Sequence, residues 1–157
     1  MSSADPYGAC MSEPETKNQD GDAGPRCGQV VLHDVREELE LLHDSVLIAV
    51  SESGFDEAST FAVRLALEEA VANAFRHGNA EDPTKTVTVE YRVDEQTIWL
   101  SIEDQGSGFD PEAVPEPTED ANLEIPSGRG IMLMRAYMTE VEIMSPGNRI
   151  EMTFHRS

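Results

Sequence analysis

A carboxylate and a carboxamide stand one helical turn apart in the segment LEEAVANAFRHGN, residues 67–79. These residues are Glu69 and Asn73, and Arg76 and His77 continue the same polar row toward the end of a predicted helix. Carboxylate and amide oxygens suit a hard cation such as Mg²⁺, and a carboxylate can also take a proton. The alternative is a solvated helix face that carries an ordinary i, i+4 polar pair. His77 has no His or Cys partner at ligand spacing, so we expect it to close the helix rather than to bind a metal.

A second carboxylate, Asp104, stands at the end of a predicted strand and is followed by Gly106 and Gly108. The apolar phase of that strand is set by three residues at alternate positions: Ile98, Leu100 and Ile102. Side chains two residues apart in a strand point to the same face, so Asp104 is predicted to face the core. Because an unpaired buried carboxylate is costly, an inward Asp104 is suited to accept a hydrogen bond from an exocyclic amine in an otherwise apolar pocket. A strand followed by an ordinary glycine turn is the alternative.

The segment SGRGI, residues 127–131, supplies glycines at the start of another predicted helix. Backbone N–H groups at such a helix start can bind an anion without a positively charged side chain. The segment is not a P-loop, because no Gly-Lys-Ser or Gly-Lys-Thr follows. The alternative is that these glycines only end one element and begin the next. The proline-rich residues 110–127 ahead of it have no strong period, and so long a loop is usually functional or disordered.

Two earlier helices must position these groups. The first is predicted to begin at Asp34, with Glu37 as its capping-box partner, and to end at Gly54. The second runs over the segment FDEASTFAVRLALEEAVANAFRH, is opened by Asp56 or Ser59, and is closed by the glycine that follows. Apolar residues repeat at helical spacing in both, so each is expected to pack one side on a core.

Strands are predicted before and after these helices in the sequence. A short strand covers residues 29–33, and residues 86–93 alternate between apolar and polar side chains as a half-buried strand does. Residues 94–96 form the turn to the strand that ends near residue 102, and residues 141–154 form a closing hairpin. The order β-α-α-β-β-loop-α-β-β predicts an α+β fold, a two-layer α/β sandwich with a mixed, mostly antiparallel sheet and helices on one face.

The chain of 157 residues carries 31 acidic and 11 basic side chains, for a net charge of −20. Such a surface repels phosphate backbones and anionic lipids, so direct nucleic-acid binding and membrane docking are disfavoured. Residues 1–28 are rich in Ser, Pro, Gly and acidic residues, so we expect a disordered acidic tail before a single domain at 29–157. Cys10 and Cys27 fall in this tail and are expected as free thiols, since neither has metal-ligand spacing to a histidine.

The sequence also indicates where in the cell the protein is located. No run in the chain is long enough to cross a membrane, and the N-terminus lacks the basic start and apolar run of a signal peptide. We therefore expect a cytoplasmic protein.

Four segments occur in a fixed order: ExxxNxxxHG at 69–78, DxGxGF at 104–109, the proline-rich loop, and GxG at 128–130. In this order and spacing the chain resembles the GHKL ATP-binding superfamily, which is shared by gyrase, the large heat-shock chaperone and sensor histidine kinases. Within it, the segments LALEEAVANAFRHGN, DQGSGFDPEAVPEP and PSGRGIMLMRAYMTEVEI resemble bacterial anti-sigma factor serine/threonine kinases. The resemblance spans roughly residues 29–156 and implies the Bergerat ATP-binding fold, with ATP and Mg²⁺ as cofactors.

By this resemblance, Asn73 would ligate the Mg²⁺ that bridges the ATP phosphates, and Glu69 would be the catalytic general base on a serine hydroxyl of a protein. Asp104 would accept a hydrogen bond from the adenine amino group. The proline-rich loop would be a mobile lid, and because it contains no Lys or Arg, Arg129 or Arg76 would supply the basic side chain that some members place there. The implied nucleotide-binding residues are Asn73, Arg76, Asp104, Gly106, Gly108, Phe109, Ser127, Gly128, Arg129, Gly130 and Ile131.

The resemblance further implies an ATP-binding anti-sigma factor that sequesters a sigma factor and phosphorylates a small anti-sigma antagonist on serine. Such a protein regulates transcription without contacting nucleic acid or membrane, and the family suggests a homodimer through the N-terminal strand and first helix. The alternative is a nucleotide-gated binding module of the same fold without kinase activity. A detached sensor histidine kinase is disfavoured, because His33 and His43 lie beside or within a single short helix rather than on a dimerising phosphoacceptor helix.

Overall fold

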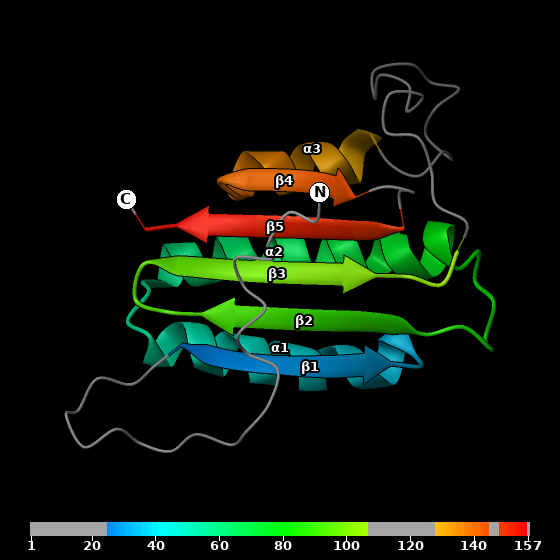
Figure 1. The fold of residues 1–157 in the computed structure, drawn as a ribbon, viewed down its shortest axis with the longest axis horizontal. Coiled ribbons are helices and arrows are strands. Elements are labelled where there is room, and N and C mark those ends of the chain that lie inside the picture. The colour runs from blue at the N-terminus through cyan, green and yellow to red at the C-terminus, as the bar shows by residue number, and fades with distance from the viewer. Residues whose placement is uncertain (1–24, 107–127, 145–147, 157) are drawn as a thin grey trace, which may run out of the picture.

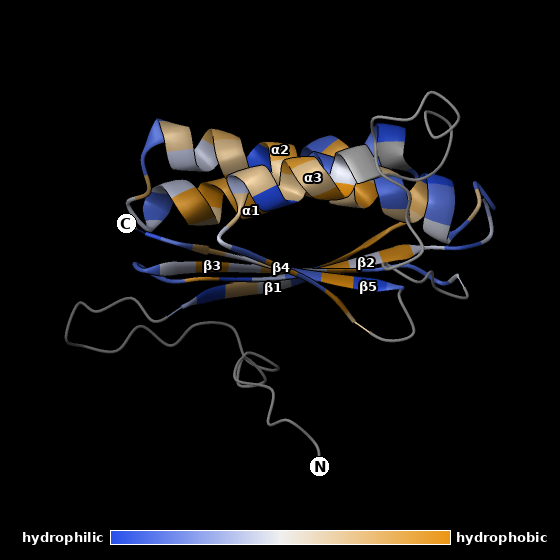
Figure 2. Ribbon diagram, turned by 90° about the horizontal axis from the view of Figure 1, so that it is seen from above, coloured by the Kyte–Doolittle hydropathy of each residue, from blue (hydrophilic) through white to orange (hydrophobic). Residues whose placement is uncertain are grey.

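The computed structural model describes residues 25–106, 128–144 and 148–156, without the side chains of residues 35, 128 and 129. Its elements, in chain order, are β1 (Arg26–Leu32), α1 (Val35–Glu52), α2 (Glu57–Asn73), a π-helical turn (Ala74–Gly78), β2 (Val87–Val93), β3 (Thr97–Glu103), α3 (Gly128–Tyr137), β4 (Glu140–Met144) and β5 (Arg149–His155). The strands of this described part form one layer (Figure 1), and its helices form a second layer on one face of the sheet (Figure 2). The predicted two-layer α+β fold is therefore confirmed.

The sheet has the strand order β1-β2-β3-β5-β4, and every neighbouring pair among the described strands is antiparallel. The prediction of a mixed sheet differs from this in one respect. β4 does run parallel to β3, because each is antiparallel to β5, but β5 lies between them and keeps them from pairing. The described sheet is therefore antiparallel throughout.

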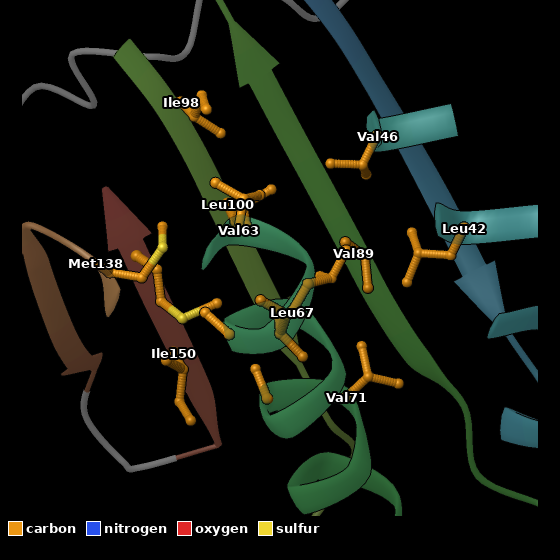
Figure 3. Packing of buried hydrophobic residues seen from close by; sticks show 14 of the residues in the cluster. Leu42, Val46, Val63, Leu67, Val71, Val89, Ile98, Leu100, Met138 and Ile150 are labelled. Carbon is orange, nitrogen blue, oxygen red and sulfur yellow. The ribbon is translucent and has the colours of Figure 1, made fainter. Parts of the chain in front are cut away.

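α2 is the central helix, in contact with both α1 and α3, and it packs its apolar side on the sheet (Figure 1). Val63, Leu67 and Val71 of this helix are fully buried in one cluster with Val89 of β2 and Leu100 of β3 (Figure 3). Burying one such side chain contributes about 1.5–3 kcal/mol relative to leaving it exposed. With its apolar side fixed on the sheet, α2 presents its polar residues on two flanks, one toward α1 and one toward α3.

The start of α1 is fixed by two carboxylates. The Oδ1 atom of Asp34 accepts a hydrogen bond from the backbone N–H of Arg36 (2.7 Å) and caps the helix. The prediction of Glu37 as the capping-box partner of Asp34 is wrong. Instead, the Oε1 atom of Glu38 accepts from the N–H groups of His33 (3.1 Å) and Asp34 (3.2 Å). Glu37 is exposed, whereas Glu38 lies on the side of the helix that faces the incoming chain.

The ends of the next elements follow the predictions more closely. Gly54, with a φ of 88°, follows the end of α1. Asp56 rather than Ser59 is the cap of α2, since its Oδ1 atom accepts from the N–H of Ser59 (2.8 Å). The regular α-helix ends at Asn73, and the π-helical turn carries the chain on to Gly78, the predicted end.

The N-terminal part differs from the prediction in two ways. β1 begins at Arg26 rather than at residue 29, so the sheet includes the last residues of the predicted tail. Cys27 is in a disulfide, so the prediction of a free thiol is wrong. Spacing along the chain does not fix the distance between two sulfur atoms, on which a disulfide depends. The rest of the predicted tail and residues 110–127 lie outside the described residues. In the described part of the chain, no helix combines the length and the apolar character that a membrane span requires.

Candidate active site

The end of α2, the end of β3 and the start of α3 meet at the same end of the molecule (Figure 1). Glu69 and Asn73 meet α3 there. A Cβ atom placed on Gly130 would lie 2.6 Å from Nδ2 of Asn73 and 3.3 Å from Oε2 of Glu69. The absence of a side chain at residue 130 therefore lets the first turn of α3 approach these polar groups without displacing the Asn73 amide. Both polar side chains are half-buried, so the row is not a freely solvated helix face.

A second close contact joins Asp104 to the end of the π-helical turn. Asp104 is only 8% exposed, and a Cβ atom on Gly78 would overlap its carboxylate. A Cβ atom on Gly106 would in turn overlap the backbone carbonyl of Gly78. The inward phase predicted for Asp104 is confirmed, and both glycines are required because there is no space for a side chain.

Burial, the largest influence, raises the pKa of the Asp104 carboxyl above its ordinary value, and nearby Glu103 adds to the rise. The backbone N–H of Gly106, which donates to Oδ1 of Asp104 (2.7 Å), opposes the rise in pKa, as does Lys85. A carboxylate has about four acceptor sites. Among the described residues the N–H of Gly106 occupies one of them, so the buried carboxylate can still accept a hydrogen bond from a ligand.

Two asparagines that we did not predict as site residues hold this carboxylate in place. Asn79 is fully buried, and it accepts from the N–H of Gln105 (2.7 Å) and donates to the carbonyl of Thr86 (3.0 Å). The N–H of Asp104 donates to the carbonyl of Asn148 (2.9 Å), and Nδ2 of Asn148 donates back to the carbonyl of Asp104 (3.2 Å). The signal for Asn79 was its position directly after the helix-ending glycine. Asn148 carried no signal beyond its place in a turn.

The π-helical turn separates Arg76 from the residues with which it was predicted to act. The N–H of Asn79 donates to the carbonyl of Ala74 (2.8 Å), which is an i→i+5 bond. A turn closed in this way holds more residues than an α-helical turn, so Arg76 is rotated away from the row of Glu69 and toward the side of Ala72. Arg76 and Ala72 line a pocket on the α1 side of α2. Arg76 thus borders the α1 side of α2, and its role in binding a nucleotide stays a prediction.

His77 is half-buried beside this turn. Burial, the largest influence, and the charge of Arg76 lower the pKa of His77 below its ordinary value, so the neutral imidazole is favoured at neutral pH. A neutral ring does not complement a helix dipole by charge. The charge of His77 therefore does not explain why this residue stands at the end of the helix. Among the described residues no group of three His, Cys, Asp or Glu side chains is placed to hold a metal ion. A metal near Asn73 would therefore depend on its amide oxygen together with oxygens of a bound ligand.

The remaining predicted residues are placed only in part. Three of them lie outside the described residues: Gly108, Phe109 and Ser127. Gly128 and Arg129 form the start of α3. Ile131 follows in the same turn and is buried, with 6% of its surface exposed. The anion-binding role of this helix start therefore stays a prediction.

Comparison with known proteins agrees with this fold. The histidine kinase-like ATPase domain matches residues 35–154, which is most of the chain. The chain therefore belongs to the histidine kinase-like ATPase family.

Several proteins of known name are similar to this chain. The anti-sigma F factor of Clostridium perfringens is 34% identical over 89 residues, which cover 55% of this chain and 64% of that protein. The anti-sigma F factor of Anoxybacillus flavithermus is 32% identical over 98 residues, covering 59% and 67%. The serine-protein kinase RsbW of Listeria innocua is 27% identical over 99 residues, covering 59% and 63%. The chain thus spans 64% of the length of the first of these relatives.

Proposed function

We propose that the chain binds Mg-ATP between α2, β3 and α3 and transfers the terminal phosphate to a protein serine, as an anti-sigma factor with serine/threonine kinase activity. One observation carries the proposal: Glu69 and Asn73 lie side by side against Gly130, while Asp104 is buried against Gly78 at the same end of the fold. The family assignment supports the nucleotide, and the names of the relatives support the kinase and anti-sigma parts.

Asp104 would recognise the adenine. Its carboxylate is oriented by the N–H of Gly106 and keeps acceptor capacity for an exocyclic amine. Accepting such a bond requires the ionised carboxylate, whereas burial favours the neutral form. A donor from the ligand would compensate for this burial, so binding of adenine and ionisation of Asp104 are expected to favour each other.

The residues at the start of α3 fit a magnesium-bound triphosphate. Gly130 leaves a space beside Asn73 that any side chain would fill. The two orientations of a carboxamide differ by half a turn, so Asn73 can present either its oxygen or its nitrogen to that space. When bound, Mg²⁺ would neutralise phosphate charge, which matters in a chain with a net charge of −20. Backbone N–H groups at the helix start would hold phosphate oxygens without adding a basic side chain.

Glu69 would orient the serine hydroxyl and accept its proton, which needs a carboxylate beside the phosphate position. Its neighbour Glu68 has different surroundings. The Oε1 atom of Glu68 lies 3.5 Å from Nε2 of His43 and 3.3 Å from Nε of Arg64, on the α1 flank of the helix. Two consecutive glutamates thus face opposite flanks of α2, and Glu69 is the one beside Gly130.

The proposed partners are a sigma factor and a small serine-bearing antagonist, in the cytoplasm where sigma factors act. The names of the relatives, anti-sigma F factor and serine-protein kinase RsbW, support both partners. A homodimer through β1 and α1 is also part of the proposal. β1 is an edge strand of the sheet, and Leu41 and Ile48 are large exposed apolar residues on α1, which suits burial in an interface.

Phosphate transfer from radiolabelled Mg-ATP to small candidate antagonists of the same organism tests the proposal. Glu69→Gln is expected to lower the transfer rate by about 10²–10⁴-fold, while the Kd of ATP changes by less than about threefold. Glu68→Gln is the matched control, because it removes the neighbouring carboxylate from the opposite flank, and it should keep both properties.

Each of the other possible outcomes contradicts one part of the proposed function. An equal loss of transfer in both glutamate variants would remove the specific role of Glu69. Tight binding of ATP without transfer to any acceptor would replace the kinase by a nucleotide-gated binding module. Absence of ATP binding would contradict the site itself.

A further inference from the structure

A pocket of about 410 Å³ lies on the α1 side of α2. It is formed by the residues that lead into α1, by the end of α2 with its π-helical turn, and by the loop after that turn. These segments lie at the same end of the molecule as the start of α3, and α1 and α3 lie on opposite sides of α2 (Figure 1). We call it the α1-side pocket, and the lining residues that matter most are Arg36, Phe75, Arg76, Glu81 and Asp82.

The two arginines of the pocket have no carboxylate partner in the part of the chain that the structure describes. Among the described residues, neither Arg36 nor Arg76 has a side-chain ion pair or hydrogen bond, whereas Arg26, Arg64 and Arg149 each pair with a glutamate. Both side chains are exposed, and exposed Arg135 of α3 likewise has no such partner among the described residues, so it is the placement of the two arginines at one pocket that matters. Together they offer free guanidinium donors, which suit the planar fork of an oxyanion.

Two of the acidic residues that line the pocket are already engaged by donors of their own chain. Asp34 caps α1 through the N–H of Arg36. Asp82 accepts from the hydroxyl (2.7 Å) and the N–H (2.9 Å) of Thr84, and these bonds lower the pKa of Asp82 below its ordinary value. Both carboxylates are thus oriented toward donors in their own turns, and the guanidinium groups stay available to a ligand.

The charges of the pocket also select the class of anion. Attraction by the two arginines and repulsion by Asp34, Glu81 and Asp82 both grow with the charge of an oxyanion, and the three carboxylates outnumber the two guanidinium groups. A singly charged carboxylate is therefore favoured over a doubly charged phosphate. Phe75, which is half-buried, and Pro83 add apolar surface for the methylene groups that carry a side-chain carboxylate.

We propose that the α1-side pocket binds an acidic side chain of a partner protein, with Arg36 and Arg76 on its carboxylate and Phe75 against its methylene groups. A volume of about 410 Å³ suits a short peptide segment around that side chain better than a lone ion. The pocket shares no contact with Glu69, Asn73 or Asp104, so the proposal holds whether or not the chain transfers phosphate.

An NMR titration of the full ¹⁵N-labelled chain tests this proposal through the Nε–Hε signals of Arg36 and Arg76. The probe is the peptide acetyl-Leu-Glu-Leu-amide, and acetyl-Leu-Gln-Leu-amide is its neutral match. The glutamate peptide is expected to shift both arginine signals to saturation and to bind about tenfold more tightly than the glutamine peptide. Arg36→Gln and Arg76→Gln should each weaken it about tenfold. Arg135→Gln, which removes an exposed arginine of α3, should leave it unchanged.

Four results would overturn the proposal. Equal binding of the two peptides would show that the carboxylate is not recognised. Tighter binding of inorganic phosphate than of the glutamate peptide would make the pocket a phosphate site. No saturable shift up to about 10 mM peptide would show that the pocket is not a site. Backbone spectra check the fold of each variant, and Arg36→Lys keeps the charge if Arg36→Gln does not fold. Full affinity in Arg36→Lys would contradict the need for a guanidinium fork.

Discussion

The two flanks of α2 meet their neighbours in different ways. Toward α3, Glu69 and Asn73 lie against the main chain at Gly130, where a side chain would displace the Asn73 amide. Toward α1, Arg36 and Arg76 border a pocket of about 410 Å³ that side chains line. Backbone N–H groups in close contact suit the phosphates of a nucleotide, whereas free guanidinium groups in an open pocket suit a carboxylate of a protein. The contrast suggests that one helix serves a small ligand on one flank and a macromolecule on the other.

The π-helical turn connects these flanks. Its last residue, Gly78, contacts Asp104 on the side of the candidate active site, while Phe75 and Arg76 line the α1-side pocket. The loop that follows contains Ala80 and Glu81 with φ angles of 51° and 59°, in a region that non-glycine residues rarely adopt. A ligand on either flank therefore touches the same short segment, whose conformation is fixed by its surroundings.

The largest expected effect comes from a side chain at the contact with α3. In Gly130→Val, the new Cβ atom would lie 2.6 Å from Nδ2 of Asn73, so the Asn73 side chain must turn away or α3 must shift. We expect the Kd of Mg-ATP, measured by calorimetry, to rise about 100-fold or more. Ala136→Val, at an exposed position of the same helix, is the control and should bind normally. Normal binding by Gly130→Val would place the nucleotide elsewhere.

A smaller effect is expected from the carboxylate on the same flank. Asp104→Asn replaces an ionised acceptor by a neutral amide and should raise the Kd of ATP about tenfold, the cost of one charge-assisted hydrogen bond. The free energy of unfolding without nucleotide should not decrease, because burial of the charge is costly in the native protein. A large loss of stability with unchanged ATP affinity would make Asp104 a structural residue.

The two flanks should also respond to pH with opposite signs. The pKa of Asp104 is raised by burial, so the native state binds the proton more tightly and stability falls as pH rises from the ordinary carboxyl pKa through the raised one. The pKa of His43, on the α1 flank, is lowered chiefly by burial, although Glu68 opposes this. Stability should therefore fall as pH drops below the ordinary histidine pKa.

Chemical denaturation between about pH 3 and pH 8, which spans the ordinary pKa values of both groups, measures this contrast. Asp104→Asn should remove the loss of stability with rising pH and leave the loss of stability at low pH. His43→Gln should remove the loss of stability at low pH and leave the other. The same pH profile in wild type and both variants would show that neither group titrates differently in the folded chain.

The smallest expected effect is communication between the flanks. Saturating the α1-side pocket with the glutamate peptide should change the Kd of Mg-ATP by about two- to fivefold, because both ligands contact the same turn. Mg-ATP must change the Kd of the peptide by the same factor, since such coupling is reciprocal. Arg76→Gln should abolish the effect. An unchanged Kd of ATP in wild type would mean that the two flanks act independently.

The candidate site was predictable where a local rule decides the geometry. The period of two in β3 placed Asp104 on the inner face, and the motif order placed the glycine-rich helix start beside Asn73. Local rules failed where distant segments meet. A regular turn of 100° per residue put Arg76 in the row of Glu69, but the i→i+5 bond depends on how the following loop packs.

The same limit explains the other differences. Glu38 rather than Glu37 is the partner of the Asp34 cap, because the direction from which the chain enters the helix is set by β1. Asn79 links the loop after the π-helical turn to the end of β3 through Gln105, a contact that no local spacing reveals. The α1-side pocket combines three segments, so none of them alone could have indicated it.

The most direct test of the two-flank account is the Kd of Mg-ATP in Asn73→Ala and Arg76→Ala, two variants one turn apart on the same segment. Asn73→Ala should raise the Kd about tenfold or more through loss of the amide proposed to bind the metal, whereas Arg76→Ala should stay within about twofold of wild type. An equal or larger rise in Arg76→Ala would contradict the account, because Arg76 would then belong to the nucleotide site rather than to the α1-side pocket.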